Sequence, residues 1–113
     1  MENCLFCKII NGEIPSTKVY ENEWVYAFRD INPQTPVHVL VIPKKHIASL
    51  NETSSFTDRE LAECLRAIPV IAAQEGLTGG YRVISNCGAD ACQSVHHLHF
   101  HLLGGAQMAE RMA

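Results

Sequence analysis

The sequence predicts an α+β fold in which a mainly antiparallel five-stranded sheet is accompanied by one long and one short helix. Three observations support this prediction: five short segments have the composition and alternation of strands, one segment has helical periodicity, and the strand segments lie around that one long helix in the chain. The five strand segments are residues 17–22, 23–30, 37–43, 80–86 and 95–103.

Composition indicates one compact domain, residues 1–113, with 47% apolar and 19% charged residues. The net charge of −3 and the scattered basic residues argue against nucleic acid or an anionic membrane as partner, and no segment has the length of a membrane span. An odd count of five cysteines without a secretory signal favours reduced thiols and a cytoplasmic location. A small-molecule substrate is therefore expected.

The N-terminal elements follow from local signals. Residues 4–10 are apolar at helical spacing and end before Asn11-Gly12, which predicts a short helix, and Pro15 prevents its continuation. The next two segments, residues 17–22 and 23–30, are expected to form two strands joined by a tight turn.

The central elements include a buried strand and the long helix. Residues 37–43 are apolar and β-branched on both faces, as in a central strand. Thr57 and Glu60 form a capping box that begins the helix, and Pro69 is expected to kink or shorten it before Gly76. Its predicted apolar stripe consists of Leu61, Cys64, Leu65, Ile68 and Ile71.

The most informative segment is QSVHHLHFHLLGG, residues 93–105, which contains four of the six histidines. His97, His99 and His101 alternate with apolar residues, which predicts a strand with three imidazoles on one face. His96 falls on the apolar face and is expected to pack. When imidazoles lie close together, protonation of one disfavours protonation of its neighbours. Neutral imidazoles in a fixed row are suited to metal ligation or to nucleophilic and acid–base catalysis.

The segment HLHFHLL matches the pattern His, apolar, His, apolar, His and two further apolar residues, and the segments CLFCKIINGEIPS and AFRDINPQTPVHVLVIPKKHI agree with it. Together they resemble the histidine triad (HIT) family, and within it the Hint branch of nucleoside phosphoramidases. The resemblance implies an α+β homodimer whose sheets join across the interface. It also implies a hydrolase that acts at the α-phosphorus of purine nucleotides and needs no cofactor for catalysis.

The catalytic roles combine this resemblance with chemistry. His99 occupies the place of the family's nucleophile, and an imidazole that attacks phosphorus divides a difficult displacement into two easier steps. His101 is expected to protonate the leaving nitrogen or, alternatively, only to orient the substrate. Ser94 matches a hydroxyl that contacts the phosphate and leaving group, and His97 completes the row. Amides of the loop from Asn86 to Ser94 could form an anion-binding concavity.

Nucleoside contacts are implied mainly by the resemblance. Asp30 matches an acidic residue that accepts hydrogen bonds from both ribose hydroxyls, with a simple turn residue as the alternative. Phe28 and Ile31 match positions that line the purine pocket, although Phe28 would serve equally in the core. Asn86 matches a residue near the ribose and phosphate, or is a turn former. His38 is either a hydrogen-bonded core histidine or a support for the histidine row.

A structural zinc ion is the main alternative use of these residues. Cys4 and Cys7 have the spacing of a zinc knuckle, and His46 with His97 could complete a Cys2His2 site, as in some bacterial-type relatives. One Cys-x-x-Cys pair is a weaker signal than two. With zinc bound, His97 would orient the strand from outside the chemistry.

The predicted function is hydrolysis of adenosine or guanosine phosphoramidates through a nucleotidyl-histidine intermediate. The alternatives are hydrolysis of dinucleoside polyphosphates and a zinc-binding interaction module without catalysis. The sequence departs from the Hint pattern at Cys92, where glycine is common, at Arg29, and after GGAQM, where no tryptophan-containing tail follows. These departures bear on substrate preference.

Overall fold

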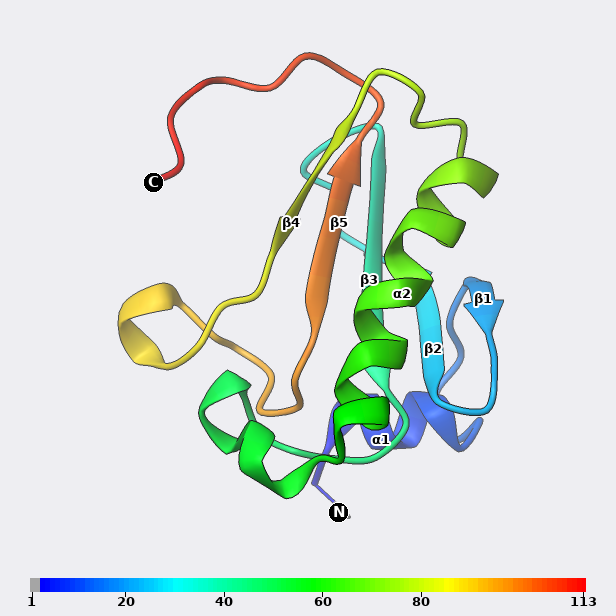
Figure 1. Cartoon of the computed structure of the whole chain (residues 1–113), viewed down its shortest axis with the longest axis vertical. Coiled ribbons are helices and arrows are strands. Elements are labelled where there is room, and N and C mark those ends of the chain that lie inside the picture. The colour runs from blue at the N-terminus through cyan, green and yellow to red at the C-terminus, as the bar shows by residue number, and fades with distance from the viewer. Residues whose placement is uncertain (1–2) are drawn as a thin grey trace.

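A computed structural model describes residues 3–113, which contain a five-stranded sheet and two α-helices (Figure 1). The strands follow the order β1-β2-β3-β5-β4, and every neighbouring pair is antiparallel. This confirms the predicted α+β fold, with β3 at the centre. In chain order the elements are α1 (Leu5–Ile10), β1 (Lys18–Glu21), β2 (Val25–Arg29), β3 (Val37–Pro43), the 3-10 helix η1 (Leu50–Ser55), α2 (Asp58–Gln74), β4 (Tyr81–Ile84), the 3-10 helix η2 (Ala89–Ala91) and β5 (Phe100–Gly104).

The two faces of the sheet are buried by different helices. Figure 1 shows α2 lying over the sheet and α1 at one end of it. Because side chains alternate along a strand, Val39 and Val41 pack in the cluster that contains α2, whereas Leu40 and Ile42 pack in the cluster that contains α1. The α1 face therefore carries the side chains that share the orientation of Leu40.

The long helix begins as predicted, with the Thr57–Glu60 capping box. It continues past Pro69 to Gln74, so the expectation that Pro69 shortens it is wrong. Leu65 is 50% exposed, because the buried stripe runs through Cys64, Ala67, Ile68, Ile71 and Ala72, at spacings of three and four residues. No helix in the described part of the chain is long and apolar enough to cross a membrane.

The histidine segment is extended over a shorter stretch than predicted, because β5 begins only at Phe100. Phe100 pairs with Val41, so the same register would set His99 opposite Ile42 and Leu98 opposite Pro43, which has no N–H to offer. Residues 95–97 form a bend instead, and Leu98 donates its N–H to the carbonyl of Ile47 at 2.7 Å. The bend leaves His96 exposed, which corrects its predicted packing role.

Candidate active site

The three histidines of the row divide between two clusters. His101 lies on β5 opposite Leu40, on the α1 face, and the ring centroids of His99 and His101 are 5.1 Å apart. His97 is fully buried and directs its Nδ1 atom toward cysteines and another histidine. The row therefore serves two sites that share a backbone.

The ring of His99 is held in one tautomer by the backbone. Its Nδ1–H donates to the carbonyl oxygen of His97 at 2.7 Å, so a neutral ring has its lone pair on Nε2. Burial lowers the pKa of His99 below its ordinary value, which keeps the ring neutral. The ring of Phe6 lies edge-on to that of His99, with the ring centroids 5.1 Å apart. The hydroxyl of Ser85 donates to the His99 carbonyl oxygen at 2.9 Å. His99 is thus a fixed, neutral ring that offers the lone pair of Nε2.

A hydrogen-bond chain sets the tautomer of His101. The backbone N–H of Gln34 donates to His38 Nδ1 at 3.0 Å, so neutral His38 carries its proton on Nε2. That N–H donates to His101 Nδ1 at 2.9 Å, which leaves the proton of neutral His101 on Nε2. Asp30 Oδ2 lies 3.4 Å from His38 Nε2. His38 therefore supports the histidine row rather than only filling the core.

Burial keeps His101 and His38 neutral in the free protein. Burial, followed by the neighbouring histidines His99 and His38, lowers the pKa of His101 to about 4, and burial also lowers the pKa of His38. The carboxylate of Asp30 acts in the opposite direction on both rings. A negatively charged ligand beside His101 would raise its pKa further, because an opposite charge favours the protonated ring.

Cys4, Cys7, His46 and His97 form the second cluster, and their ligand atoms all lie within 4.8 Å of one another. Cys4 Sγ is 3.3 Å from His97 Nδ1, and Cys7 Sγ is 3.4 Å from His46 Nδ1. The two Nδ1 atoms are 3.1 Å apart. A tetrahedral zinc ion with the usual bond lengths separates its ligands by roughly 3.3–3.8 Å. The sulfur–nitrogen distances of 3.3, 3.4 and 3.5 Å lie in this range, and the distance between the two Nδ1 atoms is slightly below it.

The donor chemistry also fits zinc. His97 Nε2–H donates to the Pro43 carbonyl at 2.8 Å, so its Nδ1 presents a lone pair to the cluster. Cys4 caps α1 and its Sγ accepts the N–H of Cys7 at 3.2 Å. Burial, with a contribution from Cys4, raises the pKa of the Cys7 thiol to about 11, so a thiolate here needs a cation. All five cysteines of the chain are free.

Three of the residues predicted to bind the nucleoside lie at or just beyond the end of β2: Phe28, Asp30 and Ile31. Asp30 is half-buried, and its Oδ1 accepts the N–H of Asn32 at 2.8 Å, which forms a turn. Phe28 is buried with its ring centroid 5.5 Å from that of Phe6, inside the apolar cluster on the α1 face. Ile31 is 94% exposed. The structure thus brings Asp30 to the histidines and leaves Ile31 at the surface.

The loop from Asn86 to Ser94 is braced by a residue that is not among the predicted ones. Gln93 donates to the carbonyl of Ala48 at 2.7 Å and accepts the N–H of Gly88 at 3.0 Å. Asn86 is half-buried and Ser94 is exposed. Cys92 adopts the left-handed conformation, with φ of 60°, which accounts for the glycine common at this position. The brace holds Ser94 beside the segment that leads to His97.

Phe6, Ser85 and Gln93 all support the site without belonging to the predicted set. Each acts through a contact between segments far apart in the chain, so no local pattern reveals it. The one available signal was position: Phe6 lies between Cys4 and Cys7, and Gln93 precedes Ser94.

Comparison with known proteins agrees with this geometry. The HIT domain family model matches residues 11–108. The 14 kDa zinc-binding protein of Zea mays is 53% identical over 106 residues, covering 92% of this chain and 83% of that protein. The purine nucleoside phosphoramidase of Escherichia coli K12 is 42% identical, covering 99% and 95%. A solved HIT family hydrolase from Clostridium thermocellum superposes with a TM-score of 0.95 at 49% identity, covering 100% and 99%. With this match over most of its length, the chain belongs to the HIT family and is a nucleotide hydrolase or transferase of that family.

Proposed function

We propose that the protein hydrolyses the P–N bond of purine nucleoside phosphoramidates and releases the nucleoside monophosphate. The observation that carries this proposal is the arrangement of two tautomers: His99 presents a lone pair on Nε2, and His101 presents an N–H on Nε2. One ring is prepared to attack and its neighbour to donate a proton. The phosphoramidase activity named for the E. coli relative supports the same chemistry.

In the first step, His99 Nε2 attacks the α-phosphorus, and the P–N bond to the leaving group breaks. The electron pair of that bond passes to the leaving nitrogen, which takes a proton from Nε2 of protonated His101 and departs as the amine. The bound phosphoryl group supplies the negative charge that favours protonated His101. The added proton is on Nδ1, so His38 Nε2–H no longer donates to that atom in this state. His97 O stabilises the charged intermediate by accepting the Nδ1–H of His99.

In the second step, water attacks the phosphorus of the nucleotidyl-histidine. The bond between phosphorus and His99 Nε2 breaks, its electron pair returns to the ring, and His101 accepts the proton released by the water. The site is then restored to its starting protonation. Ser94 and the loop amides are proposed to contact the phosphoryl oxygens, and Asp30 to accept hydrogen bonds from the ribose.

We further propose that Cys4, Cys7, His46 and His97 hold a structural zinc ion, which is consistent with the zinc-binding name of the Zea mays relative. Bound zinc would link α1, through Cys4 and Cys7, to His46 in the segment after β3 and to His97, two residues before His99. It would fix the carbonyl of His97, which holds His99. No metal is needed for the proposed chemical steps.

We also propose a homodimer that joins two sheets through β4. In the described sheet β4 is an edge strand, and it exposes the apolar side chains of Tyr81 and Val83. An unpaired edge with apolar side chains is suited to pairing with a second copy. Light scattering should give twice the chain mass of 12.5 kDa, and a mass of one chain would contradict this proposal.

The test of the function is turnover of an adenosine or guanosine 5′-phosphoramidate, with and without a chelator. Release of the monophosphate in both conditions is the expected result. Faster cleavage of a dinucleoside polyphosphate would identify the alternative hydrolase. Zinc content without turnover of either substrate would identify a zinc-binding interaction module.

A further inference from the structure

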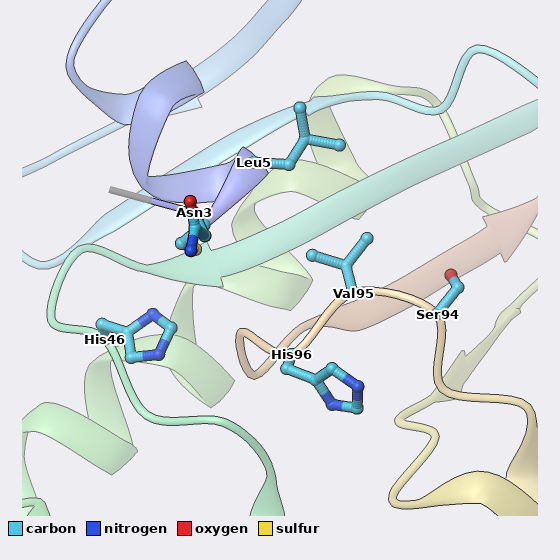
Figure 2. A pocket seen from close by; sticks show the side chains of 7 residues that line it. Asn3, Leu5, His46, Ser94, Val95 and His96 are labelled. Atoms are coloured by element: carbon cyan, nitrogen blue, oxygen red, sulfur yellow. The ribbon is translucent and has the colours of Figure 1, made fainter. Parts of the chain in front are cut away.

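Helix α1 is short, and its hydrogen bonds to the rest of the protein run through the sulfur atoms of the metal cluster. It has six residues, too few for a helix that is stable by itself in water. Within residues 3–113, its hydrogen bonds to segments beyond residue 14 are those of Cys4 and Cys7 to His46 and His97. Figure 2 shows the start of α1 beside His46 and the segment that leads to β5.

His97, by contrast, is held by contacts that need no metal ion. Its Nε2–H donates to the Pro43 carbonyl at 2.8 Å. The next residue, Leu98, donates its N–H to the carbonyl of Ile47 at 2.7 Å. The first turn of α1 is therefore the part of the cluster whose position depends most on a bound metal.

Phe6 connects this first turn of α1 to the reacting histidine. It lies between Cys4 and Cys7 in the sequence, and its side chain is 5% exposed. Its ring lies edge-on to the rings of His99 and Phe28, with centroids 5.1 and 5.5 Å away. Edge-to-face contacts at these separations are favourable and depend on orientation. The ring of Phe6 therefore restrains His99 and Phe28 while α1 keeps its place.

We propose that Phe6 is a positioning residue that makes nucleotide binding depend on the metal. In the proposed function, on which this inference rests, His99 attacks the phosphorus, and Phe28 is predicted to line the purine pocket. Phe6 thus contacts a residue for each end of the nucleotide. A metal held by Cys4 and Cys7 fixes the first turn of α1 and with it the ring of Phe6. Without the metal, the nucleotide has to order this turn when it binds, which weakens its affinity.

Coupling between the metal and the nucleotide is reciprocal. If zinc tightens nucleotide binding by some factor, the nucleotide must tighten zinc binding by the same factor. We expect about tenfold, which lies within the usual range for coupling between two sites. The chemical steps need no metal, so the zinc-free protein should still turn over its substrate, with a higher KM.

The test measures both halves of this cycle with AMP, a product of the proposed reaction. Calorimetry gives the Kd of AMP for the zinc-loaded and the zinc-free protein. Competition with a chromophoric chelator gives the Kd of zinc with and without saturating AMP. Both ratios of Kd values should be about ten and should agree with each other. Circular dichroism of the zinc-free protein reports whether it keeps its fold.

Two matched substitutions test the role of Phe6. Phe6→Leu keeps all four metal ligands and an apolar side chain but removes the edge-on contacts, so it should bring both ratios close to one. Phe56→Leu makes the same exchange at a buried phenylalanine in the cluster that contains α2, and it should leave both ratios at the parent value. Coupling that came only from unfolding of the zinc-free protein would persist in Phe6→Leu and would overturn the proposal.

The outcomes separate this proposal from the one it rests on. Equal Kd values for AMP with and without zinc would overturn the coupling, while turnover of the phosphoramidate upholds the proposed function. Failure to bind zinc would overturn the metal cluster and this inference but leave the hydrolase proposal intact. Failure of AMP to bind either form would also overturn the inference, and absence of turnover as well would overturn the proposed function with it.

Discussion

Removal of the His38 imidazole tests how the site protonates its leaving group. In the His38→Leu variant, His101 Nδ1 loses the donor at 2.9 Å that fixes its tautomer. An orphaned buried hydrogen-bonding group costs about 1–3 kcal/mol, and a barrier that is higher by this amount corresponds to roughly a 5- to 150-fold decrease in kcat. KM should change little, because His38 is 5% exposed and is not proposed to contact the substrate.

The leaving group decides whether this loss occurs. A phosphoramidate of an alkyl amine needs a proton on the departing nitrogen, whereas a nucleotide p-nitrophenyl ester releases a stable anion without one. His38→Leu should therefore reduce kcat strongly with the amine and by less than about threefold with the ester. His38→Gln, whose amide can donate to His101, should recover part of the activity with the amine.

Two results would refute this argument. Equal losses with both substrates would show that His38 supports the nucleophile or the packing rather than the proton donor. Full activity of His38→Leu with the amine would show that the tautomer of His101 is set by other groups. Thermal unfolding of each variant separates these cases from a simple loss of the fold.

Three further predictions concern the ribose, the metal and pH. Asp30→Ala should lower kcat/KM and narrow the gap between ribo- and 2′-deoxyribonucleoside substrates; unchanged discrimination would make Asp30 only a turn residue. Elemental analysis should find close to one zinc per chain, abolished when Cys4 and Cys7 are both replaced by Ser; a metal that survives this change would have to be held elsewhere. Burial lowers the pKa of His101 to about 4, so between pH 6.5 and 4 the unfolded chain binds a proton that the folded chain does not. The free energy of unfolding therefore decreases as the pH is lowered, by at most about 2 kcal/mol at pH 5. Denaturant unfolding of His101→Asn should therefore depend less on pH across this range, and an unchanged dependence would contradict that assignment.

The strand and helix segments could be predicted because their signals are local. The β-branched segment that became β3 is apolar on both faces, and the Thr57–Glu60 capping box fixes the start of α2. The limits of β5 could not be predicted in the same way. Its start depends on the register with β3, which would set Leu98 opposite Pro43, and register is a property of two strands rather than one.

In the candidate site, too, some features follow from local sequence patterns and others depend on contacts between distant segments. The spacing of the histidines indicated the residue types and a shared face, and the Cys-x-x-Cys pair indicated two metal ligands. The separation of His97 from His99 and His101 depends on the bend at residues 95–97. The role of His38 depends on the backbone N–H of Gln34, and a main-chain donor leaves no trace in the sequence.

The nucleophilic role of His99 is the central claim, and isolation of the covalent intermediate tests it most directly. A phosphoramidate radiolabelled in the nucleoside is mixed with excess enzyme, the reaction is stopped at neutral pH during the first turnover, and the labelled peptide is mapped. The account predicts a nucleotidyl group on Nε2 of His99, and a decrease of at least about 10⁴ in kcat/KM for His99→Ala. A label on another residue, or a His99→Ala variant within tenfold of the parent, would contradict it.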